Sequence, residues 1–310
     1  MDIIGIIMSA GKAAVDVALY TLIPVMVVML VIMKYLEIKG ILDWIVRLMT
    51  PVLRPFGVTG IAIFALIQLN FVSFAAPLAA LAVMEKRGTS DRHLAAALAM
   101  LFAMGQGNVF YPLIPFGLHW GNAILISVAG GLAAAAITYH LTGRRLSSLT
   151  LKQSEDDLHN EKTGQGLIAI INGAGSDAIR LSLGSVPMLI LSLTIVGILK
   201  ACGAIEGLTA LLEPLLTWLN LPVVYVMPAL TKLLAGGTAY YGVMTDILHK
   251  GLMTPLQVNA SAGFMIQTFD LPGIGIFLGI ASRFVRLFRY AIPGALAGIL
   301  LRGVMHILIS

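Results

Sequence analysis

Apolar segments long enough to cross a lipid bilayer follow one another along almost the whole chain. Six windows of about 20 residues, the length that spans the hydrocarbon core, cover residues 13–33, 93–116, 119–142, 180–200, 256–277 and 290–308. Of the 310 residues, 58% are hydrophobic and 11% are charged, whereas a soluble domain carries about 25% charged residues. One soluble core could not bury that much apolar surface. The sequence therefore predicts an all-α polytopic membrane protein and excludes a water-soluble fold.

Two further apolar segments, residues 59–84 and 222–247, are long enough to span but are interrupted in the middle. The interruptions are Gln68, Asn70, Ser73 and Pro77 in the first segment, and Thr231, Lys232 and Gly236-Gly237-Thr238 in the second. Non-helical backbone at membrane depth is tolerated only where it is buried in protein or lines a wet cavity. We therefore expect two broken helices beside a cavity. The alternative is that these glycines and Pro77 only allow tight helix packing.

The second half of the chain repeats the first at an offset of 163 residues. The shift places Pro24 on Pro187, Gly40 on Gly203, Asp43 on Glu206, Pro51 on Pro214, Gly88 on Gly251 and Gly131 on Gly294. Each half then reads as a span, an amphipathic stretch, a broken segment, a polar turn and two more spans. We expect one repeat over residues 1–142, a charged linker over 143–172 and a second repeat over 173–310.

The distribution of Lys and Arg predicts the orientation of the repeats. If both broken segments enter the membrane and return on the same side, then 15 of the 20 Lys and Arg share one face, in residues 34–58, 85–92, 143–180 and 278–289. Full crossings would divide these cations almost evenly, against the positive-inside rule. Each half then has three spans and one re-entrant hairpin. Because three is an odd number of crossings, the second half has the opposite orientation, and the repeat is inverted. The linker is then cytoplasmic, and both termini are non-cytoplasmic in a bacterial inner (plasma) membrane.

Two amphipathic stretches, residues 38–56 and 204–219, precede the broken segments. The first has one apolar helical face formed by Ile41, Trp44, Ile45, Leu48 and Val52. Such a helix fits in the membrane interface plane. A surface helix packed on the bundle is the alternative.

Charged residues within apolar segments mark candidate site positions, because an intramembrane charge is costly unless it is paired or wetted. Lys232 lies deep in the second broken segment, and Asp270 lies in the run Gly263–Phe277. We expect both to line a solute cavity, as a pair that substrate or a proton opens. Alternatively, Lys232 reaches an interface and Asp270 caps a half-helix.

Uncharged polar residues gather around the same segments. Amides both donate and accept hydrogen bonds without carrying charge, and so suit a neutral polar ligand. Interhelical hydrogen bonding is the alternative role for each residue. The candidate substrate-binding residues are Gln68, Asn70, Ser73, Gln106, Asn108, Thr231, Lys232, Thr238, Gln267 and Asp270.

Other chemistry has little support in the sequence. No His lies at i, i+3 or i+4 from a Glu, Asp or Cys inside a span, and neither a P-loop nor a Gly-x-Ser-x-Gly motif occurs. We therefore expect no metal site, no catalytic residues, no cofactor and no enzymatic activity. Coupling to Na⁺ or H⁺ and assembly into a homo-oligomer are left open, and nucleic acid is not an expected partner, since the cations flank apolar segments.

The stretch Pro51–Val58, followed by a broken small-residue segment, resembles the Gate, or nucleoside-recognition, domain family. Its echo in the second half is Leu212–Pro222. Related modules occur in concentrative nucleoside transporters, in ferrous-iron transport protein B and in spore-maturation proteins A and B. The resemblance implies that residues 70–77 and 232–240 form a gate, and that the solute is nucleoside-like.

Together these features predict a transporter that moves a small polar solute by alternating access at a midplane site between the repeats. The runner-up is a non-transporting membrane protein with an assembly or regulatory role, of the spore-maturation type.

Overall fold

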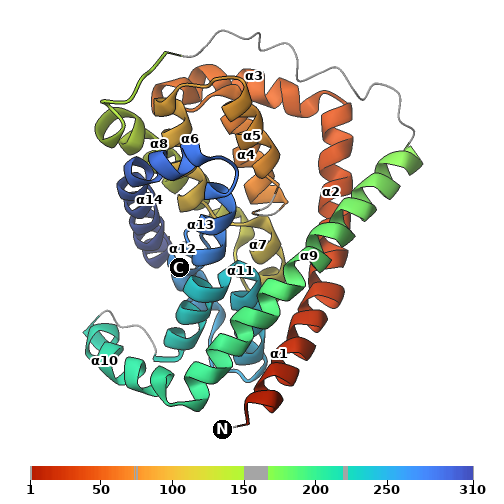
Figure 1. Ribbon diagram of the computed structural model, residues 1–310, viewed down its shortest axis with the longest axis vertical. Coiled ribbons are helices and arrows are strands. Elements are labelled where there is room, and N and C mark those ends of the chain that lie inside the picture. Colours follow the sequence, from red (N-terminus) through yellow and green to blue (C-terminus); the bar gives the residue numbers. More distant parts are fainter. Residues whose placement is uncertain (1, 73, 75, 150–166, 219–222, 310) are drawn as a thin grey trace.

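The computed structural model is helical and is described over residues 2–72, 74, 76–149, 167–218 and 223–309 (Figure 1). In the first half the elements are α1 (Ile3–Val17), η1 (Ala18–Leu22), α2 (Ile23–Ile38), α3 (Ile41–Leu53), η2 (Arg54–Phe56), α4 (Gly60–Phe71), α5 (Leu78–Lys86), α6 (Asp91–Ala103), α7 (Gly107–Leu113), η3 (Ile114–Phe116), α8 (Trp120–Ile137) and η4 (Thr138–Thr142). In the second half they are α9 (Leu167–Ala201), α10 (Ala204–Trp218), η6 (Val223–Tyr225), α11 (Val226–His249), α12 (Pro255–Met265), α13 (Leu271–Leu278) and α14 (Ser282–Ile309).

The offset of 163 residues carries the helices of one half onto those of the other. It places α3 on α10, α6 on α12, α7 on α13 and α8 on α14, to within a few residues at most boundaries. In Figure 1, α3 lies at the top of the molecule and α10 at the bottom.

Two long helical arms run side by side along one flank of the molecule (Figure 1). One is the continuous run α1–η1–α2, whose π-helical turn precedes Pro24, and the other is the 35-residue α9, which contains Pro187. Lys34 and Asp177 form an ion pair between the arms. Because α9 begins at Leu167, the last residues of the range expected as linker, 143–172, are helical. Residues 150–166 of that linker lie outside the described part of the chain.

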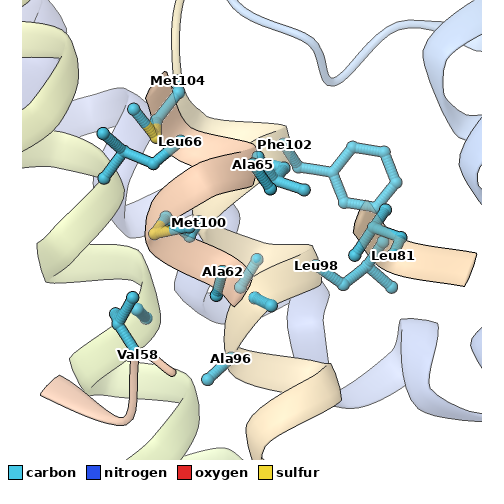
Figure 2. Close-up of a cluster of buried hydrophobic side chains, with 14 of the residues drawn as sticks. Val58, Ala62, Ala65, Leu66, Leu81, Ala96, Leu98, Met100, Phe102 and Met104 are labelled. Carbon is cyan, nitrogen blue, oxygen red and sulfur yellow. The ribbon is translucent and has the colours of Figure 1, made fainter. Parts of the chain in front are cut away.

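Helix α6 lies at the centre of the largest buried cluster. All residues from Leu94 to Ala103 are buried, and Figure 2 shows Met100 and Phe102 packed beside Ala62 and Ala65 of α4. Alanine and glycine let backbones approach closely in a membrane, where dispersion replaces the hydrophobic driving force. The alanines of α4 and α6 therefore let these two helices pack closely within a core that also contains Leu, Ile, Met and Phe.

Four segments of the described chain are long and apolar enough to cross a membrane: Ile3–Tyr20, Asp91–Phe116, Trp120–Thr142 and Ser282–Ile309. Two windows predicted as uninterrupted spans are in fact discontinuous. Residues 93–116 break between α6 and α7, and residues 256–277 break between α12 and α13. Polar residues lie at both breaks, Gln106 and Asn108 in the first window and Gln267 and Asp270 in the second.

The four segments rich in Lys and Arg are joined at one end of the molecule. Arg283 pairs with Asp91, and the Arg92 amide donates to the Ser147 carbonyl. The His140 side chain contacts the Pro55 carbonyl at 2.7 Å. Together with the contact of Lys34 and Asp177 between the arms, these contacts support the shared face that the cation pattern predicts.

Helix α3 turns its apolar face away from the protein. Trp44, Leu48 and Val52 are 64%, 59% and 65% exposed, whereas Leu42 and Leu53 are buried. The chain then bends by 104° into α4. An exposed apolar face beside such a bend favours the interface-plane interpretation over packing on the bundle.

Candidate functional site

Both segments predicted to be broken are interrupted at the expected places. Helix α4 ends at Phe71, and α5 starts after Pro77. In the second segment, Gly236 has φ 82° and ψ −178° inside α11. That backbone conformation is open to glycine and strained for other residues.

Helix α11 folds back at Gly236 instead of crossing the molecule. A straight helix of its 24 residues would be about 36 Å long. However, Tyr225, which precedes α11, donates from its hydroxyl to the Gln257 carbonyl at 2.5 Å, and α12 begins only six residues after α11 ends. Tyr225 also shares a buried cluster with Tyr240 and Met244, which lie in the part of α11 that follows Gly236. The segment is therefore a helical hairpin.

The α6–α7 break and the α12–α13 break lie against each other, and each supplies hydrogen-bond donors to backbone carbonyls of the other. We call this place the crossing. The Thr268 amide donates to the Phe102 carbonyl at 3.2 Å, and the Thr268 hydroxyl donates to the Met104 carbonyl at 3.0 Å. In return, Gln106 Nε2 donates to the Gln267 carbonyl at 3.0 Å. A helix end leaves up to four carbonyls without an intrahelical partner, and here the opposite break supplies donors for them.

Helices α4 and α5 contact each other and form the first hairpin, and α11 forms the second. A short chain of hydrogen bonds connects the first hairpin to this crossing. The Ser127 hydroxyl of α8 donates to Asn70 Oδ1 at 2.8 Å and accepts from the Gly105 amide at 2.8 Å. Asn70 Nδ2 donates to the Leu66 carbonyl. Asn70 therefore fits the hydrogen-bonding role that we considered as the alternative to ligand contact.

A buried ion pair ties the second hairpin to the same crossing. Lys232 Nζ donates to Asp270 Oδ2, and each side chain is 2% exposed. Asp270 Oδ1 also accepts from the Gly273 amide at 2.7 Å and so caps α13. The predicted pair is present, and Asp270 in addition has the capping role that we considered as its alternative.

Four buried side-chain amide oxygens accept no hydrogen bond within the described part of the chain. They belong to Gln68, Gln106, Asn108 and Gln267. Buried polar atoms are normally satisfied, and each exception needs an explanation. All four residues were predicted from the sequence as solute contacts, and Gln106 and Gln267 lie directly at the crossing.

The remaining predicted residues have different surroundings. The Thr231 hydroxyl donates to the Met227 carbonyl of its own helix at 2.9 Å. Thr238 is 6% exposed, two residues beyond the Gly236 break. Ser73 lies outside the described residues.

Glycines allow the backbones of the two hairpins to lie close to the crossing. A Cβ on Gly107 would lie 2.6 Å from the Asn70 carbonyl oxygen, and one on Gly237 would lie 2.6 Å from Gln106 Oε1. The pair Gly236-Gly237 therefore has both roles that we weighed, a helix break and tight packing.

Sequence reasoning did not select Arg302 as a functional residue. Its side chain from α14 is fully buried and reaches the crossing, with Nη1 2.6 Å from the Ala103 carbonyl oxygen. The available signal was a single Arg inside the apolar window 290–308.

We also looked for a metal site and for surface grooves. Among the described residues no group of three or more His, Cys, Asp or Glu could hold a metal ion. A shallow groove lined by Asn172, Ser176, Arg180 and neighbouring residues contains none of the predicted site residues.

Comparison with known proteins agrees with this architecture. Residues 19–118 match the family model of the Gate domain, described as nucleoside recognition. CNTnw variants in an outward-facing state and in the intermediate 2 state match with TM-scores of 0.67 and 0.66 at 16% identity. These alignments cover 94% of this chain and 75% and 77% of CNTnw. CNTnw in an inward-facing substrate-bound state gives 0.65 at 15% identity, covering 92% and 74%.

The chain has the fold of a concentrative nucleoside transporter. No curated protein matches it in sequence. The Gate resemblance found from Pro51–Val58 is confirmed over residues 19–118, and the all-α multi-pass membrane fold class is confirmed. The fold is shared with CNTnw, and four segments of the described chain are long and apolar enough to cross a lipid bilayer.

Proposed function

We propose that this protein transports a small polar, nucleoside-like solute by alternating access, with the solute bound at the crossing of the two helix breaks. The observation that carries the proposal is the group of buried amide oxygens without partners, of which Gln106 and Gln267 lie at the crossing itself. The Gate match and the transporter fold support the solute class.

The chemistry of these oxygens selects the solute. Each oxygen loses its hydrogen bonds to water on burial and gains no protein donor in return. This desolvation costs about 1–3 kcal/mol per oxygen. A nucleoside offers several O–H and N–H donors on its sugar and base, and it carries no charge. Such a solute would satisfy the acceptors at the crossing without adding a buried charge.

The buried Lys232–Asp270 pair is suited to act as the gate. It joins the α11 hairpin to the first turn of α13, and both side chains are inaccessible. Gln106 and Asn108 are each only 2% exposed. A solute could therefore reach the crossing only after a hairpin separates from it, which is the motion that alternating access requires.

A thermal-shift screen of the purified full chain tests the proposal. Uridine and adenosine are compared with ribose, free bases, amino acids and divalent metals. A ligand at 100 times its Kd adds about 2.7 kcal/mol of stability. We expect nucleosides to raise the Tm. If no nucleoside shifts it at millimolar concentration, the proposed solute class is wrong, and the assembly or regulatory role becomes the better hypothesis.

Variants then locate the binding site. Asn108→Leu removes an unpartnered buried oxygen and keeps the number and branching of the side-chain heavy atoms, and we expect it to weaken nucleoside binding at least tenfold. Asn122→Leu makes the same change at an exposed position of α8 and should bind like wild type. Equal binding by both variants would place the solute elsewhere.

We also propose that the Arg- and Lys-rich end faces the cytoplasm of a bacterial inner membrane, with both termini on the other side. Single cysteines introduced by Gly88→Cys and Glu155→Cys, in a Cys202→Ser background, should react with an impermeant thiol reagent from the same side. Labelling from opposite sides would contradict the inverted arrangement.

A further inference from the structure

Arg302 is a fully buried cation that has no acidic partner among the described residues. The charged side chains buried in the described structure are Lys232, Asp270 and Arg302, and Asp270 pairs with Lys232. Within the described residues no carboxylate forms an ion pair with Arg302. A charge at this depth is costly unless other groups compensate it.

The compensation comes from the carbonyl ends of two half-helices. Nη1 donates to the Ala103 carbonyl at 2.6 Å, and Nη2 donates to the Ile266 carbonyl at 2.7 Å. Ala103 is the last residue of α6, and Ile266 is the C-terminal cap of α12. These carbonyls carry the negative ends of the two helix dipoles. One planar guanidinium therefore binds both helix ends at once.

Neighbouring helices leave room for this side chain. A Cβ on Gly130 of α8 would lie 2.2 Å from Arg302 Cγ, and a Cβ on Gly263 of α12 would lie 2.4 Å from the Arg302 carbonyl oxygen. Gly298, one turn before Arg302 on α14, is within close contact of Gly130. The position is thus enclosed by α6, α8 and α12, and it accommodates an arginine only because glycines line it.

Converging carbonyl ends of discontinuous helices are where transporters commonly coordinate a monovalent cation. We propose that Arg302 is a resident cation: it occupies the site between the carbonyl ends of α6 and α12 that a free monovalent cation would otherwise fill. The crossing is then held together without taking up Na⁺ at this point. Removing the guanidinium creates a binding site for a small cation.

The first test compares variants of the purified full chain in detergent, and it needs no solute. Arg302→Lys keeps a positive charge that reaches one carbonyl, whereas Arg302→Met keeps bulk but no charge. We expect the Tm to fall in the order wild type, Lys, Met, with a loss of about 5–10 °C for Met. A Met variant as stable as the Lys variant would overturn the proposal.

The second test is chemical rescue of Arg302→Ala, at constant ionic strength with choline chloride as the baseline. Ethylguanidinium or Na⁺ at millimolar concentration should raise the Tm of this variant by more than it raises that of wild type. Arg289→Ala, at an exposed position on the same helix, controls for general effects of the ions. Identical ion responses of wild type and Arg302→Ala would overturn the proposal.

If Arg302→Ala does not fold, the comparison of the Lys and Met variants still decides the question. Because the readouts are stability and cation response, failure of this proposal is distinct from failure to bind a nucleoside.

Discussion

The two hairpins make the same contact by different chemistry. Each hairpin meets the start of a half-helix, at Gly107 of α7 in the first half and at Asp270 of α13 in the second, and these two positions are equivalent at the 163-residue offset. At Gly107, the α4 backbone packs directly on the helix start. At Asp270, a carboxylate binds Lys232 of α11, the equivalent of Leu69 in α4.

This difference means that the two hairpins should respond differently to protonation and to polar solutes. Backbone packing against a glycine depends on close fit and is indifferent to protonation or to polar solutes. A buried ion pair is sensitive to both, because separating it leaves two uncompensated charges. The second hairpin is therefore the better candidate for a contact that opens during function, and the first for a fixed one.

The largest expected effect comes from breaking the ion pair on one side. Lys232→Met leaves Asp270 buried without its partner, which costs about 3–5 kcal/mol in unfolding free energy. The measurement is reversible unfolding by SDS titration in mixed micelles. The double variant Lys232→Met with Asp270→Asn removes both charges and should recover much of the loss. A double variant less stable than the single one would show that the charges do not act as a pair.

The glycine contact is the next largest. Gly107→Ala places a methyl group 2.6 Å from a hairpin carbonyl oxygen, and we expect overpacking to cost about 2–3 kcal/mol. Gly121→Ala in α8, where nothing lies within 4 Å, is the matched control and should be neutral or slightly stabilising. If both variants unfold alike, the first hairpin does not depend on close backbone approach.

The hydroxyl that links the first hairpin to the crossing should matter less. Ser127→Ala removes the donor to Asn70 and the acceptor for the Gly105 amide, at a cost of about 1–2 kcal/mol. Ser176→Ala on the exposed face of α9 should change nothing in the same unfolding assay. A wild-type free energy for Ser127→Ala would mean that water replaces the hydroxyl.

The smallest effect is expected at the exposed ion pair of the second hairpin. Lys250 and Asp246 are 2.6 Å apart with side chains 60% and 63% exposed, and such pairs contribute about 0.5 kcal/mol or less. Lys250→Ala should therefore be almost silent in the SDS titration. If Lys250→Ala lowers the unfolding free energy about as much as Lys232→Met does, burial does not explain why the Lys232–Asp270 pair is stabilising.

Several parts of this arrangement are readable from the sequence because their causes are local. A glycine pair inside an apolar segment predicts the Gly236 break. The amides of Gln106 and Gln267 were selected because uncharged polar groups are unusual in apolar windows. The second role of Asp270, as a helix cap, was weighed as an alternative and is present together with the ion pair.

The break within residues 93–116 was not predicted, and the break within residues 256–277 was considered only as the half-helix that Asp270 would cap. The reason is physical. Hydropathy measures the side chains of one window, whereas these breaks are stabilised by backbone hydrogen bonds to the other window. Gln106 and Gln267 are 161 residues apart, and Arg302 reaches a carbonyl 199 residues away. No local pattern contains such contacts.

The sequence alone determined that the chain is a helical membrane protein and where two of its apolar segments are interrupted, since both follow from apolar length and from the positions of polar residues and glycines. Only the tertiary structure decided that two further helices break, that their ends cross, and that Arg302 lies between them. Those features depend on which carbonyls remain unpaired after folding and on which distant donors come within hydrogen-bonding distance of them.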